Sequence, residues 1–301
     1  MRGVTDDLFE DSPAEPRPRR VQYDPSGLEA VGVRPPLGKY LRELWGARHF
    51  VLYDARVRLS VSQEHTFLGK IWLILNPMLL GFTFFLIFGL LLGTSRGIEN
   101  FLGYLIIGLM MFLYTARSFT AGAKSISGGK NLIRGFSFPR AALPLGVVVR
   151  EALSQLYVLV AMFLFIMLAP PSEAITPLWL LVIPIFALQT AFNWGAGMLF
   201  APLVHRIPDV ANLISLGTRL WLYASGLFYD PSRFTDDPRI LALFHFNPLY
   251  QVLDMTRDAV LYETAPSLES WLILIGWTVA AVVIGLLVFW WNEESYADEK
   301  R

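Results

Sequence analysis

The sequence predicts an all-α polytopic membrane protein, and three observations support this fold class. Hydrophobic residues make up 54% of the 301 residues and aromatic residues 14%, and the mean hydropathy of +0.47 exceeds that of ordinary soluble domains. Several apolar runs have the length of about 20 residues that a helix needs to cross a bilayer. Third, Lys and Arg are concentrated in connections that would lie on the same side of the membrane. The predicted architecture is six transmembrane helices, an N-terminal amphipathic interface helix, and an external re-entrant helical pair between spans five and six.

The six predicted spans are apolar runs with few charged residues. The first contains no charge and carries Pro77 near its start, where a proline can kink a membrane helix without ending it. The fifth run is the weakest. The last run has tryptophan at both ends, as helices anchored at both interfaces do. The predicted spans are residues 71–93, 101–119, 145–169, 178–203, 210–228 and 271–291.

The placement of Lys and Arg in short connections predicts the orientation of the spans. Ten of the 25 Lys and Arg residues precede Gly69, four lie in the 124–140 connection, and Arg206 follows His205. The connection over residues 230–270 is acidic instead. Because cytoplasmic connections carry the excess of cations, both termini are predicted to be cytoplasmic and the acidic connection external.

The segments outside the spans divide the chain further. Residues 1–36 are polar and rich in proline, without the short apolar core of a signal peptide, and predict a disordered cytoplasmic tail. In residues 37–68, apolar side chains from Leu37 to Trp45 recur at three- and four-residue spacing, which predicts a basic amphipathic helix in the interface plane. A soluble helical hairpin is the alternative. Residues 69–292 form the predicted transmembrane domain, and 293–301 a cytoplasmic tail whose first two acids mark the end of the last span.

The connection between spans five and six is too long for a simple turn. The stretch "RILALFHFNPLYQVLDMTRDAVLY" is typical of two short amphipathic helices that separate at Asn247–Pro248, because proline disfavours helical geometry in the residue before it. An external or re-entrant pair of helices is predicted here.

No catalytic or metal-binding pattern is present in the sequence. The absence of cysteine excludes disulfides and thiolate metal sites. The segment "SISGGKN" lacks a Walker motif, because Asn131 follows Gly129–Lys130 and Lys124 occupies the position of the first required glycine. No metal-ligand spacing links the four histidines His49, His65, His205 and His245. The sequence therefore predicts neither a catalytic residue nor an ATP site of this type.

Charged and aromatic side chains within the spans are the candidates for a transport path. Arg219 is the one cation near the middle of a predicted span, where a charge is costly; a role along a path and pairing inside the protein explain it equally well. Arg117 and the Arg150–Glu151 pair lie nearer span ends and are expected to snorkel or pair. Aromatic rings in spans one and five would let sugar faces stack, although packing against lipid accounts for them as readily. The predicted path residues are Phe82, Phe85, Arg219, Trp221, Tyr223, Phe228 and Tyr229.

Three short motifs, in order along the chain, carry a resemblance to a known family. The stretch "NLIRGFSFPRAALPL" resembles the loop between the second and third spans of polysaccharide-exporting ABC transporter permeases of the type-2 exporter superfamily. "FLGKIWLILNPM" is similar to the start of the first span in that family, and "FNPLYQVLDMTRDAVLY" to its external connection. The likeness extends over residues 37–292, and the long N-terminal extension resembles actinobacterial members that export lipid-linked galactan.

The resemblance implies a homodimeric permease of the bacterial inner (plasma) membrane that works with two copies of a separate ABC ATPase subunit. Such a complex of permease and ATPase moves a polyprenyl-linked glycan of the O-antigen, teichoic acid or galactan type outward, for cell wall biogenesis. The permease is then not itself an enzyme: it holds no cofactor, ATP and Mg bind to the ATPase, and no nucleic acid is involved. A drug or small-lipid ABC exporter permease and a polyprenyl-dependent membrane glycosyltransferase are the alternatives.

The resemblance also implies roles for two groups of residues. A loop that couples to the ATPase corresponds to Leu132, Ile133, Arg134, Phe138, Pro139 and Arg140. An external gate corresponds to Asn247, Pro248 and Arg257. The sequence does not specify the sugar repeat or the length of the glycan.

Overall fold

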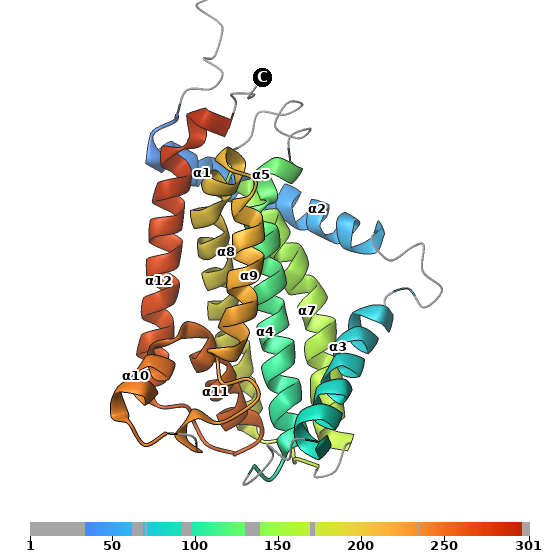
Figure 1. Cartoon of the computed structure of the whole chain (residues 1–301). Helices are drawn as coiled ribbons and strands as arrows, with labels where there is room; N and C mark the ends of the chain where they lie inside the picture. The colour runs from blue at the N-terminus through green and yellow to red at the C-terminus, as the bar shows by residue number, and fades with distance from the viewer. Residues whose placement is uncertain are drawn as a thin grey trace, which may run out of the picture. The chain divides into compact units, whose positions relative to one another are not determined.

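The computed structural model describes residues 34–61, 69, 71–91, 98–129, 139–168, 172–233 and 235–296, which belong to one compact unit, Gly32–Arg301. Every regular element in these ranges is helical, as the sequence predicts. Long helices run side by side, with α1, α5 and the C-terminal end of α12 at one end of the bundle and α10 and α11 at the other (Figure 1). The predicted tail over residues 1–36 lies outside the described residues apart from its last three positions.

Four of the described helices are long and apolar enough to cross a membrane, so the chain is a multi-pass membrane protein. They correspond to the predicted second, third, fourth and sixth spans. The four are α4 (Phe101–Ala123), α7 (Ala142–Leu168), α8 (Val182–Arg206, extended at its start by η3, Pro177–Leu181) and α12 (Leu268–Trp291).

Shorter helices occupy the positions of the first and fifth predicted spans. Helix α3 (Ile71–Phe84) runs through position 77 and continues as the π-helix η2 (Phe85–Leu91), which the sequence did not predict. Helix α9 (Val210–Tyr223) has 14 residues and ends five residues before the predicted end of the fifth span. The chain turns there because Gly226 adopts a φ of +60°, a conformation that favours glycine.

The centre of the bundle consists of α4, α8 and α12. Helix α4 is the most enclosed of the four long helices, and α8 packs against both α4 and α12. Two glycines of α8 permit these close approaches. A Cβ on Gly197 would lie 3.2 Å from the Cα of Gly122 in α4, and a Cβ on Gly195 would lie 2.5 Å from the backbone nitrogen of Val282 in α12. Small residues allow membrane helices to approach closely, and here they determine which faces of α8 meet its neighbours.

Two helices, not one, form the amphipathic N-terminal region. Helix α1 (Leu37–Gly46) and helix α2 (Arg48–Val61) meet at Ala47. Tyr40 and Leu44 of α1 are buried, whereas Trp45 is 70% exposed. Helix α2 packs against α7. The predicted end of this region, residues 62–68, lies outside the described residues.

The prediction of two short helices on either side of Asn247–Pro248 is confirmed. They are α10 (Pro238–Phe246) and α11 (Pro248–Val260). The Asn247 side chain caps α11 by accepting a hydrogen bond from the backbone N–H of Leu249 at 3.0 Å. Helix α11 is largely buried against α4, α8 and α12, whereas α10 has no buried residue. Short helices complete the described part: α5 (Ser125–Gly128), η4 (Pro231–Arg233) and η5 (Glu293–Tyr296).

Candidate functional site

Only the end of the predicted ATPase-coupling loop is described. Leu132, Ile133, Arg134 and Phe138 lie outside the described residues, while Pro139 and Arg140 directly precede α7. The side chain of Arg140 is only 13% exposed, and its guanidinium lies 4.0 Å from a carboxylate oxygen of Glu293. It also donates to the backbone carbonyl of Glu293, and the backbone N–H of Arg140 donates to the Glu293 carboxylate at 3.2 Å. Arg140 is thus turned toward this chain's own C-terminal segment.

Tyr40 completes this group, which we name the Glu293 cluster (Tyr40, Arg140, Ala141 and Glu293). The Tyr40 hydroxyl donates to Glu293 Oε2 at 2.9 Å and accepts from the backbone N–H of Ala141 at 3.0 Å. Burial raises the pKa of both the Tyr40 phenol and the Glu293 carboxyl above their usual ranges. The cluster therefore joins α1, the entry to α7 and η5, segments more than 100 residues apart in sequence.

Sequence reasoning missed Glu293, which it interpreted as the polar end of the last span. Tyr40 belongs to the predicted apolar set of α1, and the structure buries it. Nothing in the sequence pairs Glu293 with Arg140, because the contact depends on how η5 folds back after α12. A tyrosine hydroxyl on the buried face of an amphipathic helix is the one available signal that a polar partner lies beneath it.

The Glu293 cluster predicts a specific pH dependence. Because the folded state raises the pKa of Glu293, the contribution of this carboxyl to stability is largest at low pH and is lost as the pH rises through the folded pKa. The melting temperature of the wild type relative to Glu293→Gln should therefore increase as the pH falls from 8 to 5. Thermal unfolding of the two purified proteins across this range checks the prediction. A constant difference, or one that shrinks as the pH falls, would contradict it.

A cavity of about 570 Å³ lies beside Arg219, between α4, α7 and α9. Three cations line it, Arg117, Lys124 and Arg219, together with the single acid Glu151. Arg117 Nε lies 3.6 Å from Glu151 Oε2, and Arg150 Nη2 donates to Glu151 Oε1 at 3.0 Å. Of the two expectations for Arg117 and the Arg150–Glu151 pair, snorkelling or pairing, the structure shows pairing.

Arg219 is exposed and differs from the other arginines of this cavity. Among the described residues, no carboxylate or carbonyl accepts a hydrogen bond from it. The neighbouring Thr218 hydroxyl bonds within its own helix, to the carbonyl of Ile214 at 2.7 Å. With Lys124 and Arg117 on the same cavity, Arg219 presents positive charge where an anionic group could bind.

The predicted path aromatics divide into buried and exposed groups. Phe228 is 3% exposed and stacks on Phe88 with ring centroids 4.4 Å apart, so the turn after α9 is packed against η2. Phe85 is half-buried on the same core. Phe82 and Tyr223 are 54% and 58% exposed, on α3 and α9 respectively. The structure therefore brings Phe228 into the core of the chain and leaves Phe82 and Tyr223 on its surface.

Trp221, Tyr229 and Asn247 connect the end of α9 to the α10–α11 junction. Trp221 Nε1 donates to Asn247 Oδ1 at 2.9 Å, and Asn247 Nδ2 donates to the carbonyl of Ala224 at 2.9 Å. The Tyr229 hydroxyl donates to the carbonyl of Tyr223 at 2.9 Å. Pro248 is buried as the first residue of α11. Asn247 thus joins the C-terminal end of α9 to the start of α11, which it also caps.

Arg257 is buried beneath this connection, with 1% of its surface exposed. Its guanidinium donates to the carbonyls of Gly226 at 3.1 Å, Leu227 at 3.2 Å and Tyr104 at 3.3 Å, and it lies 3.4 Å from the centroid of the Tyr104 ring. A Cβ on Gly108 would lie 2.6 Å from Arg257 Nη2, so this glycine provides the space for the guanidinium. Arg257 therefore fixes α11 and the 224–229 turn to α4.

The two groups of residues lie at opposite ends of the helical bundle. The Glu293 cluster is at the end where α1 and α5 lie, and Arg257 and Asn247 are at the end where α10 and α11 lie (Figure 1). Within the described residues, no group of three or more His, Asp or Glu side chains could hold a metal ion.

Comparison with known families decides the class. A model of the ABC-2 type transporter family matches residues 58–261, more than half of the chain. The chain belongs to the ABC-2 type transporter family. The matched range begins in α2 and ends directly after α11, so it includes five of the six predicted spans as well as the α10–α11 pair.

The sequences of individual relatives align with most of this ABC-2 transporter. An O-antigen export system permease protein RfbA of Klebsiella pneumoniae is 28% identical over 77% of this chain and 87% of its own length. The protein of the same name from Myxococcus xanthus is 24% identical over 86% of this chain and 98% of its own. A second such protein of Klebsiella pneumoniae is 29% identical over 66% of this chain and 75% of its own. The likeness therefore extends over 75–98% of the length of these permeases.

Proposed function

We propose that this chain is the permease subunit of an ABC exporter that moves a polyprenyl-linked polysaccharide outward across the bacterial inner membrane. The observation that carries the proposal is the match to three permeases named for O-antigen export, two of which it covers over 87% and 98% of their length. The glycan belongs to the O-antigen, teichoic acid or galactan type. A drug or small-lipid ABC exporter permease is the alternative within the family.

The proposed topology has six spans with both termini in the cytoplasm. Helix α3 together with η2 supplies the first span, and α9 supplies the fifth. The 14 residues of α9 extend about 21 Å, less than a hydrocarbon core of about 30 Å. We therefore place the buried α11 within the outer part of the membrane, as a re-entrant pair with α10. The amphipathic helices α1 and α2 lie along the inner face, where exposed Trp45 suits the interface.

The proposed energy source is a separate ABC ATPase, present in two copies with a homodimer of this chain. ATP and Mg bind to that partner. The connection over residues 124–140 contacts it, and the Glu293 cluster transmits its movement. Because Arg140 is bonded to Glu293, a force on this connection would act on α1 and α12 as well as on α7. Such a rigid-body response of packed helices is a known form of switching.

The docking role is tested with a charge reversal that avoids the Glu293 cluster. Arg134→Glu should weaken co-purification of the ATPase, because it places a carboxylate in the basic connection. Insertion into the membrane should be unchanged. Arg239→Glu, on exposed α10 at the opposite end of the bundle, is the matched control and should co-purify normally. Equal recovery of the ATPase with both variants would contradict docking at this connection.

Arg219→Ala is expected to lower export by roughly tenfold or more, because a hydrogen bond to a charged group contributes about 1.5–3 kcal/mol. The proposed partner is the diphosphate of the polyprenyl carrier as it passes the cavity between α4 and α9. Assembly with the ATPase should be unaffected, since Arg219 is exposed and makes no bond within the described part of the chain. Export by Arg239→Ala, which removes an equally exposed arginine, serves as the control. Wild-type export by Arg219→Ala would contradict this role.

A direct test of the function compares this chain alone with its complex. The complex with the ATPase should hydrolyse ATP faster when a polyprenyl-linked oligosaccharide is supplied, and not when a small amphiphilic drug is supplied. Stimulation by the drug alone would favour the alternative exporter. Turnover of a nucleotide sugar by the purified chain without any partner would favour a membrane glycosyltransferase instead.

A further inference from the structure

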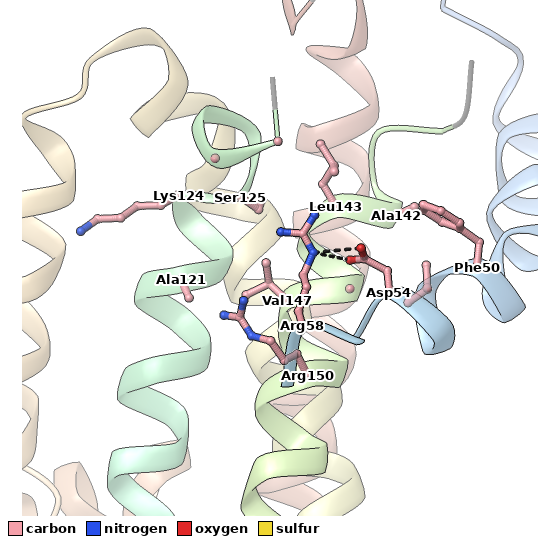
Figure 2. Close-up of a pocket in the computed structure, with 14 residues that line it drawn as sticks. Phe50, Asp54, Arg58, Ala121, Lys124, Ser125, Ala142, Leu143, Val147 and Arg150 are labelled. Carbon is pink, nitrogen blue, oxygen red and sulfur yellow. Dashed lines mark hydrogen bonds and ion pairs between the residues drawn. The ribbon is translucent and has the colours of Figure 1, made fainter. Parts of the chain in front are cut away.

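A second cavity, of about 310 Å³, lies between α2, the α4–α5 junction and the start of α7 (Figure 2). It is distinct from the cavity beside Arg219, although Lys124 borders both. Three cations and one acid line it: Arg58, Lys124, Arg150 and Asp54. The surplus of positive charge suits an anion.

Two guanidinium groups enter this cavity from different helices. Arg58 extends from α2, and its Nε donates to both carboxylate oxygens of Asp54, at 2.9 and 2.7 Å. Its two terminal nitrogens have no acceptor among the described residues. Arg150 extends from α7 and contacts Glu151, which it shares with Arg117. Figure 2 shows both arginine side chains among the residues that line the cavity, with Lys124 directed away from them. Planar guanidiniums with free donors are well suited to bind a phosphate.

The remaining lining offers a polar hydroxyl and open space. Ser125 is 6% exposed, and its hydroxyl has no hydrogen-bond partner among the described residues. A phosphate oxygen would accept from this hydroxyl. Gly128 and Gly146 leave room on two sides, because a Cβ on either would meet no atom within 4 Å.

The face of α7 below the cavity is apolar, and in the described part of the chain its side chains are exposed. Gly146 and Arg150 lie on the same side of the helix as an exposed row, since these positions repeat at three-, four- or seven-residue intervals. We name the row the α7 stripe: Tyr157, Val160, Leu164 and Leu168, which are 42%, 59%, 52% and 78% exposed. The basic cavity therefore lies at the N-terminal end of the α7 stripe, on a helix that is long enough to cross a membrane.

We propose that this cavity binds the phosphate of an anionic phospholipid, with an acyl chain along the α7 stripe. Arg58 and Arg150 bind the phosphate oxygens, and Ser125 donates to one of them. The exposed aromatic rings of Phe50 and Tyr53 on α2 offer a surface for the second chain. The lipid would hold α2 against α7, independently of which substrate the protein exports.

Native mass spectrometry of the full-length purified protein tests the proposal. Titrated phosphatidylglycerol should be retained at one site roughly tenfold more tightly than phosphatidylcholine, because basic residues near the membrane favour anionic lipids. Gly146→Leu fills the cavity without removing a charge, and Arg150→Gln removes one guanidinium; both should abolish the preference. Gly276→Leu, whose Cβ also meets no atom within 4 Å, and Arg239→Gln are matched controls that should retain it.

Four results would overturn the proposal. Equal retention of the two phospholipids would remove the anion preference, and preserved preference in Gly146→Leu would place the lipid elsewhere. Displacement of phosphatidylglycerol by an equal concentration of polyprenyl diphosphate would assign the cavity to the carrier lipid. A change of oligomeric state in Gly146→Leu with lipid preference intact would instead assign the α7 stripe to a contact between copies of this chain.

Discussion

Gly285→Ala is expected to destabilise the protein by about 3 kcal/mol or more, the upper range for overpacking a close contact. A Cβ at this position would overlap the carbonyl oxygen of Gly195 and lie 2.9 Å from its carbonyl carbon. Both atoms belong to the backbone, so no side chain can move aside. The helices α8 and α12 would have to separate along the contact that holds α12 in the bundle.

Gly276→Ala, in the same helix, is the matched control. Its Cβ would meet no atom within 4 Å, and alanine has the higher helix propensity, so its melting temperature should equal or exceed that of the wild type. The measurement is the thermal loss of the monodisperse peak in size-exclusion chromatography of each variant. If the two variants have the same melting temperature, α8 and α12 do not approach as closely as described.

Arg257→Met is expected to destabilise the protein, by about 1–3 kcal/mol for each buried carbonyl that loses its donor. Methionine approximates the length of the side chain but cannot donate to the carbonyls of Gly226, Leu227 and Tyr104, which would remain buried without these bonds. The turn after α9 and the α10–α11 pair should then loosen together.

Thermal unfolding and limited proteolysis in the 224–247 region check this expectation. Arg239→Met, on exposed α10, should show neither effect. Gly108→Ala should reproduce a large part of the defect, because its Cβ would press on the Arg257 guanidinium at 2.6 Å. A stable Arg257→Met protein with normal proteolytic resistance would show that the buried guanidinium is not what fixes this connection.

Much of the helical framework could be predicted from the sequence. Long apolar runs identify α4, α7, α8 and α12 because the bilayer imposes a minimum length on a span. Asn247–Pro248 divides α10 from α11 because proline restricts the residue before it and asparagine caps the following helix. Each of these signals depends only on residues close together in the sequence, so the sequence alone is sufficient to predict the corresponding helix or helix boundary.

The contacts that position the site could not be predicted in the same way. Gly195 and Gly285 are visible as glycines, but nothing in the sequence identifies them as each other's partners. The burial of Arg257 depends on space left by Gly108, 149 residues earlier in the chain. The Arg140–Glu293 contact likewise depends on tertiary packing. The docking role inferred for Arg140 from the family resemblance stays a prediction, and its engagement with Glu293 favours Arg134 for the test.

Translocation in proteoliposomes tests the central claim most directly. This chain and its ATPase are reconstituted with ATP-binding sites outward, and a fluorescent polyprenyl-linked oligosaccharide is supplied in the outer leaflet. The account predicts that ATP moves the glycan into the lumen, where it becomes protected from an added glycosidase, and that protection is lost without ATP or without this chain. A glycan that remains fully accessible to the glycosidase, although the same complex hydrolyses ATP and transports a small drug or lipid, would contradict the assignment as a polysaccharide exporter.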